Sequence, residues 1–400
     1  MAVGRALVHG NRTHTASATV ARRTWYAWLI FACVLAAVVA RMPDYRTVTP
    51  NYRDACHHWF EGKPIYAEGV HGFLYFPHAA ILFAPFTYLP SPLGDLLWRA
   101  LSIGSLAAAV WRTAELITPA GRKNEGMAFA LMTCLAIPLA LASARNGQMN
   151  LMLTALTTFA LVDLSRERWR AGACWLCLGA AVKPLMVVPM AVAAVVYRPV
   201  LRPLAFGALV LVAAPFLTQH PGYVWEQYRI CAQKILLAGN PGNENPASDL
   251  FGLLAAMGYA VPLTVQTTAR LVAGAATIGL ALVTVQRRDA GPAALSVLAL
   301  AACYLALFNP RMENNGYVVL SPTIGALAAD ALLYRRRPAM GWFMVAAALG
   351  IAGNYEIVRG YNFWLCPLLA TLVWAYVLCH ASPIPLGKFS LSRAAPDVAG

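Results

Sequence analysis

The stretch GMAFALMTCLAIPLALASARNGQMNLMLTALTTFALVDL, residues 126–164, consists of two apolar runs joined by the polar hexapeptide RNGQMN, Arg145–Asn150. The two runs approach the roughly 20 apolar residues that an α-helix needs to span the core of a bilayer. A simple turn does not need an arginine, two asparagines and a glutamine. The meaning of the hexapeptide therefore depends on the side of a membrane that it faces.

The composition of the chain is that of a helical membrane protein. Of its 400 residues, 59% are hydrophobic and only 12% are charged, which is about half the charged fraction of a soluble domain. The formal net charge of +14 comes largely from arginines in short loops, and this pattern indicates cytoplasmic loops rather than nucleic-acid binding. The cysteines lie mostly in apolar runs, as small buried residues do. We predict an all-α polytopic membrane protein.

Basic clusters define the cytoplasmic side of the predicted protein. They are Arg22/Arg23, Arg122/Lys123, Arg166-x-Arg168-x-Arg170, Arg198/Arg202, Arg287/Arg288 and Arg335–Arg337. With all of them inside, both termini are cytoplasmic and about 10–12 helices cross the membrane. The predicted divisions are a basic N-terminus (1–24), one multi-span domain (25–380) with long outer loops (43–92 and 219–262), and a cytoplasmic tail (381–400). The first span, Trp25–Met42, is expected to remain uncleaved.

Two apolar segments do not fit a simple crossing. Gly72–Leu89 contains two helix-breaking prolines and is predicted to be re-entrant or interfacial. Ala171–Tyr197 begins and ends on the cytoplasmic side, so it is predicted to be a hairpin broken at Lys183-Pro184. A lysine inside a membrane is costly, and it needs an anionic partner.

This topology sorts the polar residues to the outer side. They come from the first outer loop, RNGQMN, the tip at Lys183, the second outer loop, and the short loops 309–317 and 354–362. Because these segments abut the ends of several spans, we predict that they form one polar chamber that opens outward. The hexapeptide would then be part of a binding surface.

An ordered set of short motifs carries a resemblance to a known family. The motifs are Tyr52-x-x-Ala55, Gly62-x-x-x-Tyr66, Phe73-x-Tyr75-x-Pro77, Asn146-Gly147-Gln148-x-Asn150 before a span, and Lys183-Pro184 in the next apolar segment. This set resembles the family 87 glycosyltransferases, which are polyprenyl-phosphate-dependent mannosyltransferase-like proteins of the GT-C fold. The resemblance implies a helical bundle whose first outer loop carries the catalytic carboxylate and which holds the lipid phosphate of the donor near the membrane surface.

The chain departs from the family pattern at two places. The family usually has an aspartate a few residues before the tyrosine matched by Tyr52, whereas this chain has Thr47-Val48-Thr49-Pro50. A histidine often found in a late outer loop is replaced by Glu313-Asn314-Asn315. The general base therefore has to be chosen among the remaining acids of the outer side.

Glycosyl transfer from a lipid phosphate needs a base for the acceptor hydroxyl and cations for the departing phosphate. The base candidates, in order of preference, are Asp54, Asp44 and Glu313. The phosphate candidates are Lys183, Arg145, Arg311 and Arg229. The candidates for binding sugar or acceptor are Tyr52, Tyr75, Asn146, Gln148, Asn150 and Asn314.

Each candidate also has a purely structural interpretation. Asp54 would otherwise be a solvated loop acid paired with Arg53 or Lys63, and Arg145 would be an arginine that extends to the membrane interface. The histidines of the first loop lack the spacing of a metal site, so neither a metal nor a cofactor is expected.

We interpret the chain as a hexosyltransferase of the outer face of a bacterial inner (plasma) membrane. It would transfer a hexose, with mannose as the expected sugar, from a polyprenyl-phosphate donor to a lipid or glycan acceptor with inversion. The alternatives are a glycolipid transporter or flippase, and a non-catalytic scaffold with the same fold. An enzyme should bring one carboxylate against the cluster of Lys183 and Arg145.

Overall fold

The computed structural model describes residues 2–43, 45–69, 71–239, 247–359 and 362–381. In these ranges every regular element is helical. Among the described residues, seven stretches are long and apolar enough to cross a membrane: 16–41 in α1 (Ala2–Arg41), α5 (Ser91–Ile117), α6 (Glu125–Asn146), 198–217 around α10 (Leu201–Ala213), α13 (Leu263–Arg287), α14 (Ala290–Phe308), and 314–334 around α15 (Ser321–Ala329).

Shorter apolar helices complete the bundle. They are α7 (Asn150–Ser165), α8 (Trp169–Val182), α9 (Val187–Val196), α16 (Pro338–Ala352) and α18 (Leu365–Ala381). The long and short helices together follow the apolar runs of the sequence, with boundaries that differ by a few residues. The chain is thus an all-α polytopic membrane protein, as predicted.

The apolar segment around Lys183 is a broken hairpin. Lys183 has extended backbone angles, φ −149° and ψ 128°, between α8 and a short 3-10 helix, η1 (Pro184–Met186), that leads into α9. The far ends of the two arms meet, because the rings of Trp169 and Tyr197 are 6.4 Å apart. Lys183 therefore sits at the turn of the hairpin, where the Lys-Pro sequence predicts it.

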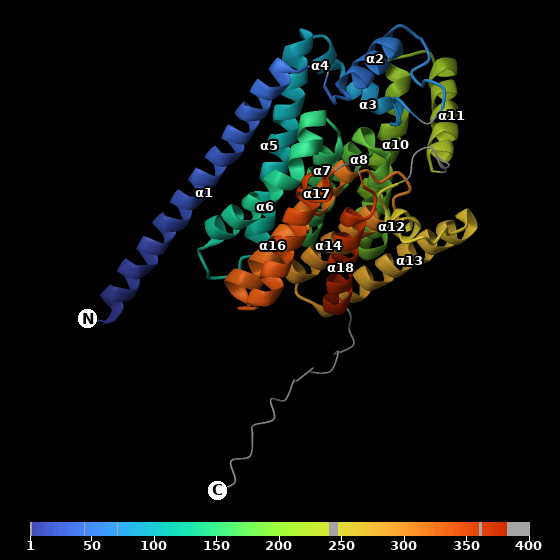
Figure 1. Ribbon diagram of the computed structural model, residues 1–400. Helices are drawn as coiled ribbons and strands as arrows, with labels where there is room; N and C mark the ends of the chain where they lie inside the picture. The colour runs from blue at the N-terminus through green and yellow to red at the C-terminus, as the bar shows by residue number, and fades with distance from the viewer. Residues whose placement is uncertain (1, 44, 70, 240–246, 360–361, 382–400) are drawn as a thin grey trace.

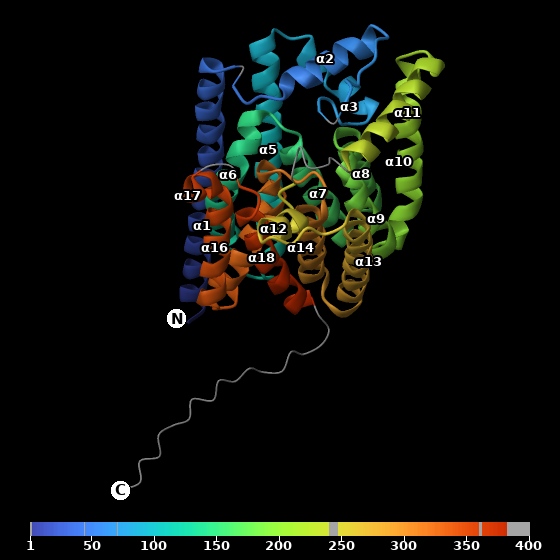
Figure 2. The ribbon, with the colours of Figure 1, turned by 45° about the vertical axis from the view of Figure 1, so that its right-hand side comes forward.

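The first outer loop forms a cap over one end of the bundle. It contains α2 (Thr49–Phe60), α3 (Pro77–Leu82) and α4 (Ala84–Thr87), and the last two are much too short to cross a membrane. In both ribbon views these helices lie at the upper end, close to the top of α11 (Pro221–Ala238) (Figures 1 and 2). Gly72–Leu89 is therefore not a crossing.

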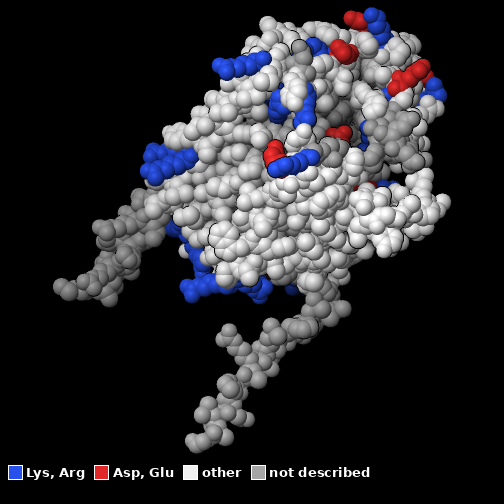
Figure 3. Space-filling model, in the orientation of Figure 1, with Lys and Arg blue, Asp and Glu red and all other residues white. Residues whose placement is uncertain are grey.

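The charges differ between the two ends of the bundle. On the face drawn in Figure 3, the lower edge carries lysine and arginine without acids, whereas acids and bases mix at the upper end near the first outer loop. An excess of basic residues is typical of the cytoplasmic ends of spans. The cap of α2–α4 thus lies at the end that the sequence predicts to face outward.

Burial distinguishes central from peripheral helices. The stretch 314–334 is 78% buried in its apolar window, and α14 is 72% buried, whereas α13 and the α10 stretch are each 17% buried. The two central helices carry small residues that allow close packing, for example Ala299, Ala302 and Ala306 on α14. The short loop between α14 and 314–334 is consequently held between the two most buried of these stretches.

Candidate active site

The hexapeptide is fixed through three consecutive backbone carbonyls. Arg99 of α5 donates from Nε and Nη2 to the carbonyl of Arg145 at 3.2 and 3.1 Å. The amide of Val48 donates to the carbonyl of Asn146 at 3.0 Å, and the indole of Trp98 donates to that of Gly147 at 2.8 Å. These bonds satisfy carbonyls at the end of α6 that its own ladder leaves free, and they join the hexapeptide to α5 and the first loop.

A glycine is required at position 147. Gly147 ends α6 with φ +67°, in the left-handed region. A Cβ at this position would lie 2.7 Å from Cγ2 of Thr49 and 3.2 Å from Cζ of Arg99. The sharp turn and the close approach of the first loop therefore both depend on this residue.

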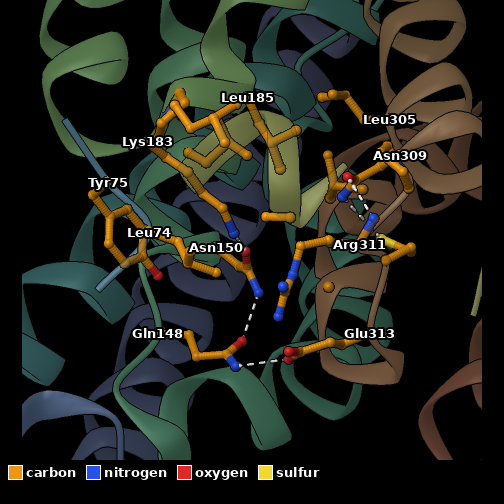
Figure 4. Close-up of a pocket in the computed structure, with 18 of the residues that line it drawn as sticks. Leu74, Tyr75, Gln148, Asn150, Lys183, Leu185, Leu305, Asn309, Arg311 and Glu313 are labelled. Carbon is orange, nitrogen blue, oxygen red and sulfur yellow. Dashed lines mark hydrogen bonds between the residues drawn. The ribbon is translucent and has the colours of Figure 1, made fainter. Parts of the chain in front are cut away.

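A mostly apolar cavity of about 240 Å³, with a set of polar and charged side chains in its wall, opens beside the hexapeptide (Figure 4). Its polar lining comes from four separate segments of the chain: Tyr75, Gln148, Asn150, Lys183, Asn309, Arg311, Glu313 and Asn315. Leucine, isoleucine and valine side chains form the rest of the wall, including Leu74, Leu185, Ile235 and Leu305. The structure thus brings together most of the segments that the sequence assigns to one chamber.

A chain of hydrogen bonds crosses the cavity from Glu313 to Lys183. Nε2 of Gln148 donates to Oε2 of Glu313 at 3.2 Å, and Oε1 of Gln148 accepts from Nδ2 of Asn150 at 2.6 Å (Figure 4). Oδ1 of Asn150 accepts from Nζ of Lys183. Each amide has a defined orientation because one side meets a donor and the other an acceptor. The ammonium group of Lys183 is therefore hydrogen-bonded to an uncharged amide oxygen. This bond does not neutralise its positive charge, which can interact with an anion in the cavity.

Tyr75 closes one side of the cavity. Its hydroxyl lies 3.0 Å from that of Tyr52, which is 1% exposed and lies behind it. Burial raises the pKa of Tyr75 to about 12, so the phenol keeps its proton at neutral pH. It can therefore serve as an uncharged hydrogen-bond donor at the cavity wall.

The loop 309–315 forms the opposite wall. Oδ1 of Asn309 accepts from the amide of Arg311 at 3.1 Å, and the carbonyl of Met312 accepts from the amide of Ser248 at 2.7 Å. Asn314 faces away from the cavity, since Oδ1 accepts from Ser248 at 2.6 Å and Nδ2 donates to the carbonyl of Asn362 at 2.9 Å. These bonds hold the loop so that the charged side chains on either side of Met312 line the cavity.

Several predicted site residues do not line the cavity. Asp54 is exposed on α2, on the face opposite to its buried Tyr52, Ala55 and Trp59. The guanidinium of Arg145 stacks over the ring of Tyr45, 4.3 Å from its centroid.

Three further predicted site residues lie outside the cavity. Arg229 is exposed and pairs with Glu226 at 2.5 Å. Asn146 contributes its carbonyl to the anchoring of the hexapeptide, while Asn314 joins loops outside the cavity. Asp44 lies outside the described residues.

The structure also reveals residues that the sequence reasoning missed. Ser143 is fully buried and accepts from Nδ2 of Asn150 at 3.2 Å, while its hydroxyl donates to the carbonyl of Asn315 at 2.8 Å. Asp95 of α5 accepts from Thr49 at 2.8 Å and from Arg53 at 2.6 Å. Two features of the sequence could have indicated these residues: a serine, Ser143, two positions before RNGQMN, and the pair Asp95-x-x-x-Arg99 inside an apolar helix.

The fold and the cavity define a class: a multi-pass membrane protein with a mostly apolar cavity that carries a few charged and amide side chains and lies under the cap of α2–α4. Residues 73–310 match the family model of glycosyltransferase family 87. This segment is more than half of the chain. The protein belongs to glycosyltransferase family 87, and it is a membrane glycosyltransferase by family.

One curated relative resembles part of the chain. It is the polyprenol-phosphate-mannose-dependent alpha-(1-2)-phosphatidylinositol mannoside mannosyltransferase of Mycobacterium tuberculosis (strain ATCC 25618 / H37Rv), 29% identical over 182 residues. The similar segment covers 39% of this chain and 42% of the relative. The likeness thus spans less than half of either protein.

Proposed function

We propose that the protein transfers a mannosyl residue from a polyprenyl-phosphate donor to a lipid or glycan acceptor at the outer face of a bacterial plasma membrane. The name of the relative supports the donor class, and the basic residues at the opposite end of the bundle support the sidedness. The observation that carries the proposal is one carboxylate, Glu313, in the same cavity as two cations, Lys183 and Arg311.

Charge balance supports a phosphate-linked donor. The lining cations and Glu313 together give the cavity wall a net charge of about +1 at neutral pH. A sugar phosphodiester has one negative charge, so the loaded site is neutral. Transfer releases a phosphate monoester, whose second ionisation has a pKa near 6 and which therefore becomes a dianion. If Glu313 takes up the acceptor proton, the product site is neutral as well.

The reaction is a single displacement. The acceptor oxygen forms a bond to the anomeric carbon while the bond from that carbon to the phosphate oxygen breaks, and its electron pair goes to the phosphate. Glu313 takes the acceptor proton, and Lys183 and Arg311 stabilise the charge that develops on the leaving group. Glu313 is the only acid among the described lining residues, which favours inversion, because retention by double displacement requires a second carboxylate close by.

The neutral groups have a complementary role. Gln148 and Asn150 are held in fixed orientations, and Tyr75 is a protonated donor, so all three suit the hydroxyl groups of a sugar. Oδ1 of Asn315 is buried without a hydrogen-bond partner, and it can accept from a bound hydroxyl. The same cavity thus holds neutral groups that can bind a sugar and a carboxylate, Glu313, that can act as a base. This combination favours an enzyme over a non-catalytic scaffold.

The test is the substitution Glu313→Gln, which keeps the shape and removes the basicity. We expect turnover with polyprenyl-phosphate mannose and bacterial membrane lipid extract to fall about 100- to 10,000-fold, while the affinity for the donor changes little. Transfer of radiolabelled mannose in nanodiscs and donor binding by the same preparation measure the two quantities. Asp54→Asn is the matched control and should retain turnover, because Asp54 lies outside the cavity. Full turnover of Glu313→Gln would exclude Glu313 as the base.

A further inference from the structure

A second, apolar groove of about 940 Å³ runs along α8, the first arm of the Lys183 hairpin, and along the α10 stretch. It shares no lining residue with the cavity of Glu313. Two helices form its long walls with the same spacing of residues. Small or slender side chains on these stripes form the floor, where the helices approach closely: a Cβ on Gly207 would lie 2.6 Å from Sγ of Cys177. The other such residues are Ala173 and Ala181 on α8, and Val210 and Ala214 along the α10 stretch.

The groove has the depth of one membrane leaflet. On α8 the stripe runs over thirteen residues, from Trp169 to Ala181, and the twelve steps between them rise about 18 Å along an α-helix. The apolar core of a bilayer is about 30 Å thick, so one leaflet contributes about 15 Å. A methylene group of an acyl chain occupies about 30 Å³, roughly the volume of a water molecule. The groove of about 940 Å³ therefore accommodates roughly thirty methylene groups, which is enough for one or two acyl chains.

The two ends of the groove differ. His78, Ile81 and Leu82 of α3 close the end near the first outer loop. Pro215 has no amide hydrogen to give to the carbonyl of Leu211 four residues earlier, and Nε2 of His78 donates to this carbonyl at 2.5 Å instead. This bond attaches α3 firmly to α10, so a chain entering from the other end stops here.

The open end carries two cations. Arg170 and Arg202 line the groove at the basic end of the bundle, and both are exposed. Trp169 lies beside them, as tryptophans do at the level of lipid headgroups. No acid lines the part of the groove that the structure describes. The open end is therefore complementary to an anionic headgroup, while the interior is complementary to hydrocarbon.

We propose that this groove binds one anionic glycerophospholipid from the leaflet opposite the catalytic cavity. Its phosphate lies between Arg170 and Arg202, and its acyl chains run along α8 and α10 as far as α3. This lipid site is distinct from the cavity of Glu313, because the two share no lining residue.

The experiment uses the full-length protein in nanodiscs that contain equal amounts of phosphatidylglycerol and phosphatidylcholine. The protein is extracted into mild detergent, and native mass spectrometry counts the lipids that remain bound. We expect one phosphatidylglycerol per chain. In Arg170→Gln/Arg202→Gln, retention of this lipid should fall about thirtyfold, since each basic residue near a headgroup contributes about a factor of five. Arg287→Gln/Arg336→Gln removes two exposed charges outside the groove and should retain the lipid.

A second variant tests the hydrocarbon part. Cys174 is exposed in the groove, so Cys174→Trp fills the space without altering either arginine. It should lose the bound lipid and keep the circular dichroism of the parent. Equal retention of phosphatidylcholine, no retained lipid in the parent, or retention in Cys174→Trp would overturn the proposal. Displacement of the lipid by added polyprenyl phosphate would also overturn it, because the groove would then belong to the donor.

Discussion

The two polar walls of the cavity are built in different ways. Residues 145–150 are held by α5 and the first loop through backbone carbonyls, and they present uncharged amides. The loop 309–315 is held by the second outer loop and by asparagines, and it presents Arg311 and Glu313. The charged wall joins the two most buried spans. The difference suggests that the amide wall orients the sugar, whereas the charges bind phosphate and move the proton.

The largest effect on donor binding is expected from Lys183→Met, which leaves Asn150 in place without the cation. Loss of one charged contact in a site shielded from water costs about 2–4 kcal/mol, so affinity for a polyprenyl-phosphate analogue should fall about 30- to 1000-fold. Microscale thermophoresis in detergent measures it. Lys63→Met, which removes an exposed partner of Glu61, is the control. Unchanged binding by Lys183→Met would show that the amide wall holds the donor by itself.

Gly147→Ala should distort the amide wall. The left-handed conformation costs an alanine about 1–2 kcal/mol, and the contact at 2.7 Å with Thr49 adds to this cost. We expect a lower unfolding temperature and weaker turnover, because Gln148 and Asn150 shift. Gly62→Ala is matched, since Gly62 has φ +70° and nothing within 4 Å of the added Cβ. Equal destabilisation of the two variants would mean that the close approach of the first loop carries no weight.

The smallest effect is expected from Arg145→Ala. The only charge of the amide wall stacks over Tyr45, and such a contact contributes about 0.5–1 kcal/mol at an exposed site. Stability should decline slightly, and donor affinity should stay within about a factor of two. A loss of affinity as large as that of Lys183→Met would show that Arg145 reaches the phosphate.

Most of the fold was predictable because apolar runs, prolines and basic loops mark helix ends directly. Lys183-Pro184 predicts the break between α8 and η1, and Pro77 and Pro85 predict that Gly72–Leu89 does not cross. The helix of the first span was harder to delimit. In the structure α1 begins at Ala2, because nothing in the basic N-terminal sequence prevents a helix from continuing.

The site was predictable in part, for a physical reason. The segments that meet could be inferred from topology, and Lys183, Gln148 and Asn150 followed from their positions at span ends. The direction of a side chain could not. Arg145 lies only three residues from Gln148, but its helical position turns it toward Tyr45. Asp54 illustrates the same point, since it lies only two residues from Tyr52 but is exposed on the opposite face of α2.

The sequence ranks Glu313 behind Asp54 and Asp44, because Arg311 two positions away indicates a local ion pair. In the structure its carboxylate accepts from Gln148, 165 positions away in the chain. Only the tertiary structure brings those two walls together.

The bond between His78 and Leu211 has a consequence for biogenesis. The two residues are 133 positions apart in the chain. Pro215 leaves the carbonyl of Leu211 without a helical donor, and His78 supplies that donor. As the chain emerges from the ribosome N-terminus first, α3 exists long before α10 does. The last turn of α10 therefore enters the bilayer with the carbonyl of Leu211 lacking a donor, until α3 of the first outer loop binds it. Insertion of this peripheral helix is thus coupled to completion of the cap.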